Sequence, residues 1–203
     1  MKKIVCFGDS ITEMGTILEL RGFIAQLADR YARRADVMAR GFSGYTTRDG
    51  RETLQEAVLS EKPDTVVLFF GTNDSCLPGQ IQHIEVDVYR KNMEYMAQHI
   101  AVTGAWLVLI TPPPLNERKT KSRTMEHTET YAQACFELGL EMNLPVVDLF
   151  HIVQEEPEWQ NTCLMDGIHM TARGMDVLFN NLCSALDKIQ PFESFERIGI
   201  KDF

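Results

Sequence analysis

The sequence has no excess of basic residues and no long apolar run. Its 20 lysines and arginines are outnumbered by 29 aspartates and glutamates, which gives a formal net charge of −9. That balance disfavours the basic surface with which proteins bind nucleic acids or anionic membranes. No apolar run reaches the roughly 18 residues of a membrane-spanning helix, and the first apolar run, residues 4–7, meets Gly8 and Asp9 too early for a signal sequence. We therefore expect a soluble, cytoplasmic protein.

Cysteine is also scarce, with five residues in a chain of 203. The cysteines form an odd set without Cys-x-x-Cys spacing, which argues against both a disulfide framework and a zinc site. They are Cys6, Cys76, Cys135, Cys163 and Cys183. We expect these thiols to be reduced and mostly buried, and we expect no bound metal.

The signatures of several large enzyme classes are missing from the sequence. It contains no Gly-x-Ser-x-Gly elbow, the motif that carries the nucleophile of α/β-hydrolases. It contains neither a phosphate-binding loop of the Walker type nor a Gly-x-Gly-x-x-Gly motif after the first expected strand. The sequence therefore does not support nucleotide chemistry, and we expect a reaction that needs no cofactor.

Hydrophobic residues make up 44% of the chain, enough to bury one sizeable core. Short apolar runs alternate with longer amphipathic stretches, a pattern typical of a parallel sheet whose strands are joined by helices. The expected strands are residues 3–7, 36–39, 65–70, 106–110 and 145–149, and the expected helices are residues 22–33, 50–59, 87–101, 125–142 and 171–189. Right-handed crossovers place helices on both faces of such a sheet. The prediction is an α/β fold, a flavodoxin-like three-layer α/β/α sandwich, in one domain over residues 1–203.

Polar and glycine-containing segments follow the first three expected strands. They are residues 8–10, 42–44 and 71–74. The carboxyl ends of parallel strands meet at one edge of a sheet, and ligands of open α/β sheets gather there. We therefore predict that the functional site lies at this edge.

Ser10, Asp166 and His169 are the residue types of a nucleophilic centre. A hydroxyl becomes an effective nucleophile when an imidazole removes its proton and a carboxylate orients that imidazole. Asn73 follows a strand, where its amide can point a donor across the neighbouring strand end. Gly44 has no Cβ and lets a backbone N–H approach a substrate closely. Together with the Ser10 N–H, these groups would form a three-donor oxyanion hole.

A second Asp-x-x-His pair, Asp148 with His151, also follows an expected strand. Residue spacing alone cannot separate it from the pair of Asp166 and His169. The later pair lies in a glycine-containing segment directly before a helix, for which Thr171 is a suitable N-cap. We favour the later pair, and we interpret the earlier one as a strand exit and the start of a helix.

Other polar residues near these motifs receive structural interpretations. Asp9 and Asp74 are expected to accept backbone N–H bonds that brace the turns around them. His83, His99 and His127 are expected to be solvated or hydrogen-bonded. Residues 115–123, with four basic side chains, are expected to form a surface loop at the rim of the site. The apolar tail, residues 191–203, is expected to pack on the body or on a partner subunit.

Four segments of the chain resemble the sequence blocks of the GDSL, or SGNH, hydrolases. These segments are residues 8–12, 40–48, 71–74 and 166–169, and the resemblance runs through nearly the whole chain. Within that superfamily, residues 40–45, residues 110–114 and the Gln82-His83 stretch before Tyr89 are similar to the isoamyl acetate-hydrolysing esterase branch.

The resemblance implies a serine esterase that hydrolyses small carboxylic esters with short acyl chains, such as acetyl, through an acyl-enzyme. It implies a catalytic triad in which Ser10 is the nucleophile, His169 the general base and then acid, and Asp166 the carboxylate that orients His169. It implies that the Ser10 N–H, Gly44 and Asn73 donate hydrogen bonds to the oxyanion. The expected partner is therefore a small-molecule ester.

Two positions depart from close relatives in that branch, which commonly have alanine in place of Thr72 and Gly-Trp in place of residues 22–23. The exact substrate is therefore open. An acyltransferase or a carbohydrate O-deacetylase could use the same site, and a non-catalytic flavodoxin-like binding module is the alternative from another class. The sequence also leaves open whether the chain forms a homo-oligomer.

Overall fold

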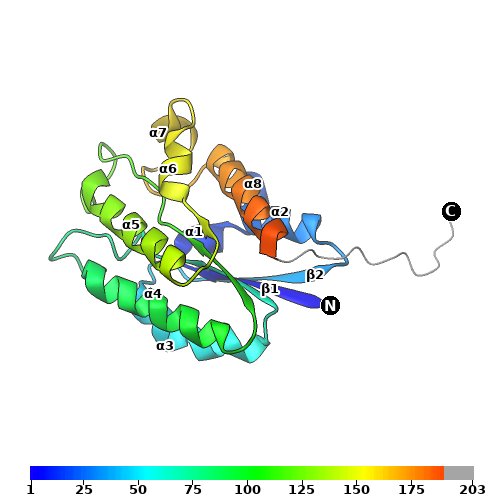
Figure 1. Ribbon diagram of the computed structural model, residues 1–203. Helices are drawn as coiled ribbons and strands as arrows, with labels where there is room; N and C mark the ends of the chain where they lie inside the picture. Colours follow the sequence, from blue (N-terminus) through cyan, green and yellow to red (C-terminus); the bar gives the residue numbers. More distant parts are fainter. Residues whose placement is uncertain (190–203) are drawn as a thin grey trace, which may run out of the picture.

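Five parallel strands form the centre of the structure, with helices on both sides (Figure 1). The computed structural model describes residues 1–189; the tail at residues 191–203, for which we predict packing on the body or a partner, lies outside the described residues. The strand order is β2-β1-β3-β4-β5. The strands are β1 (Lys2–Gly8), β2 (Ala35–Gly41), β3 (Thr65–Phe69), β4 (Trp106–Ile110) and β5 (Val146–Val147). The predicted three-layer α/β/α fold is confirmed.

The helices form two layers that cover opposite faces of the sheet (Figure 1). One layer contains α2 (Phe23–Arg30) and α8 (Ala172–Ile189). The other contains α3 (Thr47–Ala57), α4 (Val86–Ala101) and α5 (Met125–Glu141). Shorter helical segments are α1 (Ser10–Met14), α6 (Leu149–Gln154), α7 (Trp159–Thr162) and the 3-10 turns η1 (Leu18–Leu20) and η2 (Leu59–Glu61).

Alternate residues of each central strand belong to different hydrophobic cores. In β1, Ile4 and Cys6 pack with α2 and α8, whereas Val5 and Phe7 pack with α3 and α4. Successive side chains of a strand point to opposite faces of the sheet. Since both faces are covered by helices, the middle of such a strand is apolar on both sides, which explains the apolar runs in the sequence.

The first three strands end together at one edge of the sheet. Gly8, the last residue of β1, is in register with Gly41 of β2 and Phe69 of β3. A Cβ atom at Gly8 would lie 2.2 Å from Oγ1 of Thr12 and 2.3 Å from the carbonyl oxygen of Phe69. Only glycine therefore allows the chain to turn from β1 into α1 at this point.

Local capping explains where the structure differs from the predicted elements. Helix α3 begins at Thr47 and not at residue 50, because Thr46 and Asp49 form a capping box. Strand β5 is shorter than predicted, because α6 begins directly after Asp148. Helix α1 was not predicted, because five residues are too few to show an apolar period.

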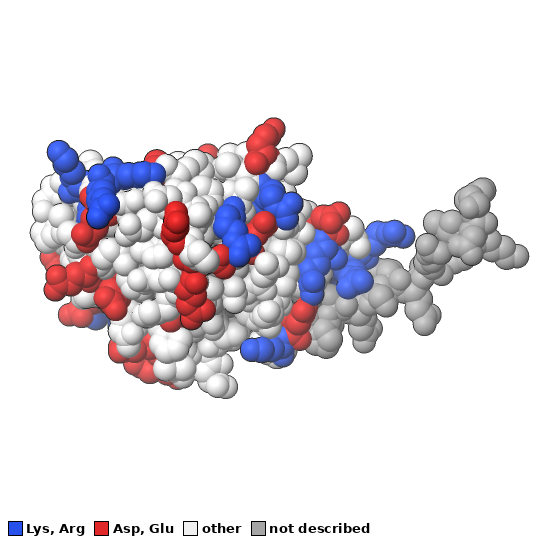
Figure 2. All heavy atoms as spheres, turned by 90° about the horizontal axis from the view of Figure 1, so that it is seen from above, with Lys and Arg blue, Asp and Glu red and all other residues white. Residues whose placement is uncertain are grey.

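Ion pairs link the helices on the α2 and α8 face. Arg30 at the end of α2 lies 2.8 Å from Asp187 of α8, and Arg21 lies 2.9 Å from Asp176 of α8. Figure 2 shows basic side chains interspersed with acidic ones over the face that it presents. Within residues 1–189, no helix is long and apolar enough to cross a membrane.

Candidate active site

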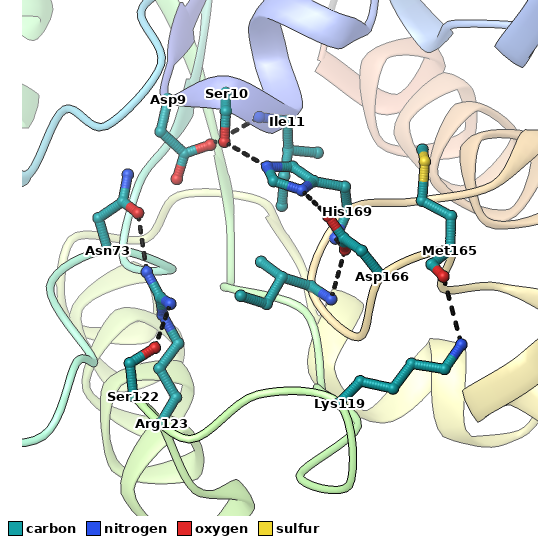
Figure 3. Close-up of polar contacts among 11 residues, drawn as sticks. Asp9, Ser10, Ile11, Asn73, Lys119, Ser122, Arg123, Met165, Asp166 and His169 are labelled. Atoms are coloured by element: carbon teal, nitrogen blue, oxygen red, sulfur yellow. Dashed lines mark hydrogen bonds and ion pairs between the residues drawn. The ribbon is translucent and has the colours of Figure 1, made fainter.

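Ser10 is the first residue of α1, at the point where β1 ends. Oδ1 of Asp9, the N-cap residue, accepts a hydrogen bond from the Ile11 N–H at 2.9 Å, as predicted for a turn-bracing carboxylate. The Ser10 Oγ atom lies 2.9 Å from Nε2 of His169 (Figure 3). The turn after β1 thus presents the hydroxyl to an imidazole from the far end of the chain.

Asp166 and His169 lie in a tight turn between Leu164 and Met170, which form an isolated antiparallel bridge. Oδ2 of Asp166 lies 2.6 Å from Nδ1 of His169. Oδ1 of Asp166 accepts the backbone N–H groups of Ile168 and His169, at 3.0 and 2.8 Å. One carboxylate therefore fixes both the turn and the imidazole ring.

These hydrogen bonds also determine the protonation state of the pair. Partial burial by itself would raise the pKa of Asp166, but the hydrogen bonds from the side chain and backbone of His169 and from the Ile168 N–H lower it to about 2. The ionised carboxylate has only acceptors, so Nδ1 of His169 carries the proton that they share. Nε2 can then accept the proton of the Ser10 hydroxyl.

The segment that follows β4 holds the turn at residues 166–169. The Asn116 N–H donates to the carbonyl of Gly167 at 2.9 Å. The Lys119 ammonium donates to the carbonyl of Met165 at 3.2 Å, as Figure 3 shows. Gly167 has φ +96°, a conformation that favours glycine. The prediction of a surface loop at residues 115–123 is therefore only partly correct. Its centre is exposed, but Leu115, Asn116 and Arg123 are buried because they pack beneath the site.

Asn73 lies just beyond β3 and is buried. Its Nδ2 atom donates to the carbonyl of Tyr45 at 2.9 Å, and its Oδ1 atom accepts from Nη2 of Arg123 at 2.9 Å. In the view of Figure 3, Asn73 and His169 lie on either side of Ser10. The amide therefore reaches the same sheet edge as the hydroxyl.

Gly44 lies in the loop between β2 and α3 and has φ +83°. Its carbonyl accepts a hydrogen bond from Nε2 of Gln82 at 2.9 Å. The preceding residue, Ser43, donates its N–H and its hydroxyl to Oε2 of Glu13, at 2.7 and 2.6 Å. Helix α1 and the segment after β3 therefore hold this loop from two sides.

Asp74 is fully buried and joins the end of β3 to α3. Its carboxyl group accepts the backbone N–H and the hydroxyl of Thr47, as predicted for a bracing residue. Burial raises the pKa of Asp74 to about 7, and the nearby Asp9 contributes to that shift. Burial likewise raises the pKa of Asp9 to about 6. The edge of the sheet therefore carries two carboxyl groups that are easily protonated.

The rival pair, Asp148 and His151, is also formed in the structure. Nδ1 of His151 lies 2.8 Å from Oδ2 of Asp148. Among the described residues, however, no serine or threonine hydroxyl is hydrogen-bonded to the His151 ring; Thr111 instead bonds to Asp148, at 3.4 Å. Of the two pairs, only the later one therefore has a hydroxyl bonded to its histidine within residues 1–189.

The sequence did not single out Arg123, Gln82 or Glu13 as residues of the site. Arg123 is one of four basic residues in a charged stretch, and nothing in the pattern separates it from the three exposed ones. Glu13 lies in the five-residue helix α1, which is too short to show a helical pattern in the sequence. Across the described part of the chain, no group of three or more His, Cys, Asp or Glu side chains could hold a metal ion.

Comparisons with known sequences identify relatives of the chain. Residues 6–177 match the model of the GDSL-like Lipase/Acylhydrolase family. The chain is 35% identical over 205 residues to the isoamyl acetate-hydrolyzing esterase 1 homolog of Mus musculus, with 92% of this chain and 82% of the relative covered. It is 36% identical over 203 residues to a GDSL esterase/lipase of Arabidopsis thaliana, with 89% of this chain and 83% of the relative covered.

Solved structures share the fold over nearly the whole chain. The crystal structure of the lipase/acylhydrolase from Enterococcus faecalis has a TM-score of 0.81 and 30% sequence identity, and the match covers 96% of this chain and 100% of that one. An acetylxylan esterase from Geobacillus stearothermophilus has a TM-score of 0.77 at 20% identity, and the match covers 98% of this chain and 97% of that one. The second comparison concerns the fold alone.

Proposed function

The chain belongs to the GDSL-like lipase/acylhydrolase family and is a carboxylic ester hydrolase, and we propose that it cleaves small esters through an acyl-enzyme on Ser10. The observation that carries this proposal is the 2.9 Å contact between the Ser10 hydroxyl and Nε2 of His169. In this scheme Ser10 is the nucleophile, His169 the general base and acid, and Asp166 the residue that orients His169.

The proposed reaction has two steps. In the first, Oγ of Ser10 bonds to the carbonyl carbon of the ester, its proton passes to Nε2 of His169, and the ester C–O bond breaks. The leaving alcohol takes the proton from His169. In the second step a water molecule gives a proton to His169 and attacks the acyl group, which leaves as the carboxylic acid. The proton on His169 then returns to Ser10, so the enzyme is regenerated without another reactant.

The proposed oxyanion hole consists of the Ser10 N–H, the Gly44 N–H and Nδ2 of Asn73. Within residues 1–189, neither of these two backbone N–H groups donates a hydrogen bond to the protein, so both are free for a substrate oxygen. Nδ2 of Asn73 has two hydrogens and gives one to Tyr45. Donors held in place before reaction stabilise the negative charge that develops on the carbonyl oxygen.

We propose short acyl chains such as acetyl as the preferred acyl groups. A relative 35% identical to this chain is called an isoamyl acetate-hydrolyzing esterase homolog, which supports a small acetate ester. The buried, unpaired cysteines support a reducing compartment such as the cytoplasm. Transfer of the acyl group to an alcohol, or removal of acetyl groups from sugars, would use the same acyl-enzyme.

Two measurements test the proposed function. A fluorophosphonate probe should label Ser10 in the intact chain, as located by mass spectrometry, and Ser10→Ala should abolish both labelling and hydrolysis of p-nitrophenyl acetate. Asn73→Ala should lower turnover by about 100- to 1000-fold. An unlabelled Ser10 in a folded and inactive protein would favour a non-catalytic binding module.

A substrate panel distinguishes the remaining alternatives. p-Nitrophenyl esters with acyl chains of two to twelve carbons should be hydrolysed fastest at the short end, and faster than acetylated sugars. Preferential partition of the acyl group to added alcohol over water would instead indicate an acyltransferase. Preferential release of acetate from acetylated sugars would indicate a carbohydrate deacetylase.

A further inference from the structure

We propose that Arg123 is a positioning residue of the oxyanion site, which fixes the orientation of the Asn73 side-chain amide. This inference rests on the proposed function, because it assigns Arg123 a role through Asn73. Arg123 lies just before α5, far from Asn73 in the sequence, and its guanidinium group reaches the end of β3 (Figure 3).

The burial of Arg123 is unusual for its surroundings. The neighbouring basic residues Arg118, Lys119 and Lys121 are exposed, but Arg123 is only 7% exposed. Arginine is rarely buried unless a carboxylate pairs with it, yet within residues 1–189 Arg123 forms no ion pair. The guanidinium group instead donates its hydrogen bonds to neutral oxygen atoms. Burial raises the pKa of the Asp9 carboxyl group, and the charge of Arg123 lowers that pKa in part, without a direct ion pair.

Three neutral acceptors surround the guanidinium group. Nε donates to the carbonyl of Thr72 at 2.6 Å, Nη2 to Oδ1 of Asn73 at 2.9 Å, and Nη1 to the hydroxyl of Ser122 at 2.9 Å. Two of these bonds go to consecutive residues of the loop that follows β3. The planar group thus binds both the backbone before Asn73 and the end of the Asn73 side chain.

The chemistry of these partners allows only one orientation of the amide. An asparagine amide has an acceptor end and a donor end of almost equal size, so a 180° flip costs little unless its partners oppose it. Arg123 has only donors, and the carbonyl of Tyr45 is only an acceptor. A flipped amide would place donors against donors and oxygen against oxygen. The two partners therefore hold Nδ2 on the side where the proposed oxyanion forms.

The positive charge of Arg123 should also strengthen the hydrogen bonds that the Asn73 amide donates. A guanidinium bonded to Oδ1 withdraws electron density from the amide and makes its N–H groups stronger donors, since hydrogen bonds in a chain polarise one another. Arg123 and Asn73 are both buried, so water screens the charge between them only weakly. Arg123 should therefore affect the transition state, where the oxyanion exists, more than the binding of the neutral ester.

The test uses Arg123→Ala, with Arg118→Ala as the matched control from the exposed part of the same segment. For p-nitrophenyl acetate, Arg123→Ala should lower kcat by about 10- to 100-fold, less than the loss of the donor itself, and should leave KM nearly unchanged. Arg118→Ala should change neither. Guanidine hydrochloride at roughly 20 mM, far below denaturing concentrations, should partly restore kcat of Arg123→Ala only.

A double-mutant cycle separates positioning from a merely structural role. In an Asn73→Ala background, Arg123→Ala should have almost no further effect, because the amide that it orients is gone. An equal loss of kcat in both backgrounds, or a change confined to KM, would overturn the proposal. If Arg123→Ala fails to fold, Arg123→Lys serves in the same cycle, because lysine keeps the charge but lacks the planar fork.

A spectroscopic readout keeps this inference separate from the proposed function. The Nδ2 resonances of Asn73 in ¹⁵N-labelled protein, assigned with Asn73→Asp, should shift in Arg123→Lys and stay in place in Arg118→Ala. Unmoved resonances in Arg123→Lys would overturn the proposal even in an active enzyme. If the wild type hydrolyses no ester and Ser10 is not labelled, the proposed function fails, but these resonances still report the contact between Arg123 and Asn73.

Discussion

Oγ of Ser10 lies 2.9 Å from Nε2 of His169, although 159 positions separate the two residues in the sequence. The turn after β1 supplies the hydroxyl, and the turn before α8 supplies the imidazole. The contact requires the carboxyl end of β1 and the amino end of α8 to meet. The arrangement of the sheet and its helices therefore creates the site, and its chemistry can be tested by removing single groups.

The two Asp-x-x-His pairs should respond differently to loss of their histidine. His169→Ala should lower kcat for p-nitrophenyl acetate by at least about 10⁴-fold, because the Ser10 proton loses its acceptor. His151→Ala should leave kcat unchanged, because His151 is bonded to Asp148 and to no hydroxyl among the described residues. Circular dichroism of both variants controls for folding. A folded His151→Ala variant that alone loses activity would contradict our assignment.

Gly44 and Gly104 have the same backbone conformation, so alanine substitutions at these two positions should distinguish the effect of backbone strain on stability from an effect on catalysis. Gly44 has φ +83° and Gly104 has φ +82°, and an added Cβ meets only Nε2 of Gln82 at 3.4 Å in the first case and nothing within 4 Å in the second. Alanine at either position should cost about 1–3 kcal/mol of stability through backbone strain. Only Gly44→Ala should also lower kcat, since Gly104 lies at the opposite edge of the sheet, before β4. Urea unfolding and kinetics of both variants test this; because alanine keeps the backbone N–H, equal kcat values would contradict the close approach to the substrate for which we expect glycine at position 44.

Asp74 should make stability depend on pH between about pH 4 and pH 7. Burial raises its pKa to about 7, above the ordinary value near 3.9 that we assume for the unfolded chain. A raised pKa stabilises the folded state fully below the unfolded value, and this contribution disappears as the pH rises through the folded value. The urea midpoint should therefore fall from pH 4 to pH 7, and Asp74→Asn should flatten this fall.

Asp166 should affect the pH dependence of stability in the direction opposite to Asp74, and at a lower pH. Its pKa is lowered to about 2, so its contribution to stability is present above about pH 4 and is lost as the pH falls through 2. Asp166→Asn should therefore change the urea midpoint below pH 4 but leave the slope between pH 4 and pH 7 unchanged. The same flattening in Asp166→Asn as in Asp74→Asn would contradict both assignments.

The five cysteines should be unreactive in the folded protein. All five are buried and unpaired, and burial raises the pKa of Cys6 and of Cys135 to about 12. Few thiolates therefore exist at neutral pH to attack a disulfide reagent. Ellman's reagent should react slowly with the native chain and should titrate five thiols after unfolding in urea. A titre below five would indicate a disulfide or a modified cysteine.

Much of the fold could be predicted because both faces of the sheet are buried. Residues 66–70 are apolar and buried, so the strand appears as an uninterrupted run that ends at the polar Gly71-Thr72-Asn73 segment. Elements shorter than about two helical turns were largely not predictable, although the start of α6 after Asp148 was expected. Helix α1 depends on the capping of one N–H by Asp9, and α6 begins where the apolar strand pattern continues.

The sequence by itself determined the chemical types at the site and the sheet edge to which they belong. Ser10, Gly44 and Asn73 each follow a strand of a parallel sheet, and the topology of such a sheet brings strand ends together. Residue spacing alone could not decide between Asp148 with His151 and Asp166 with His169, although the glycine-containing segment before a helix favoured the later pair. The sequence could not distinguish Arg123 from its exposed neighbours. Only the tertiary structure showed that His169 is bonded to Ser10 and that Arg123 is buried, because a hydrogen bond depends on positions within about 3 Å, which the packing of distant segments sets and residue spacing does not.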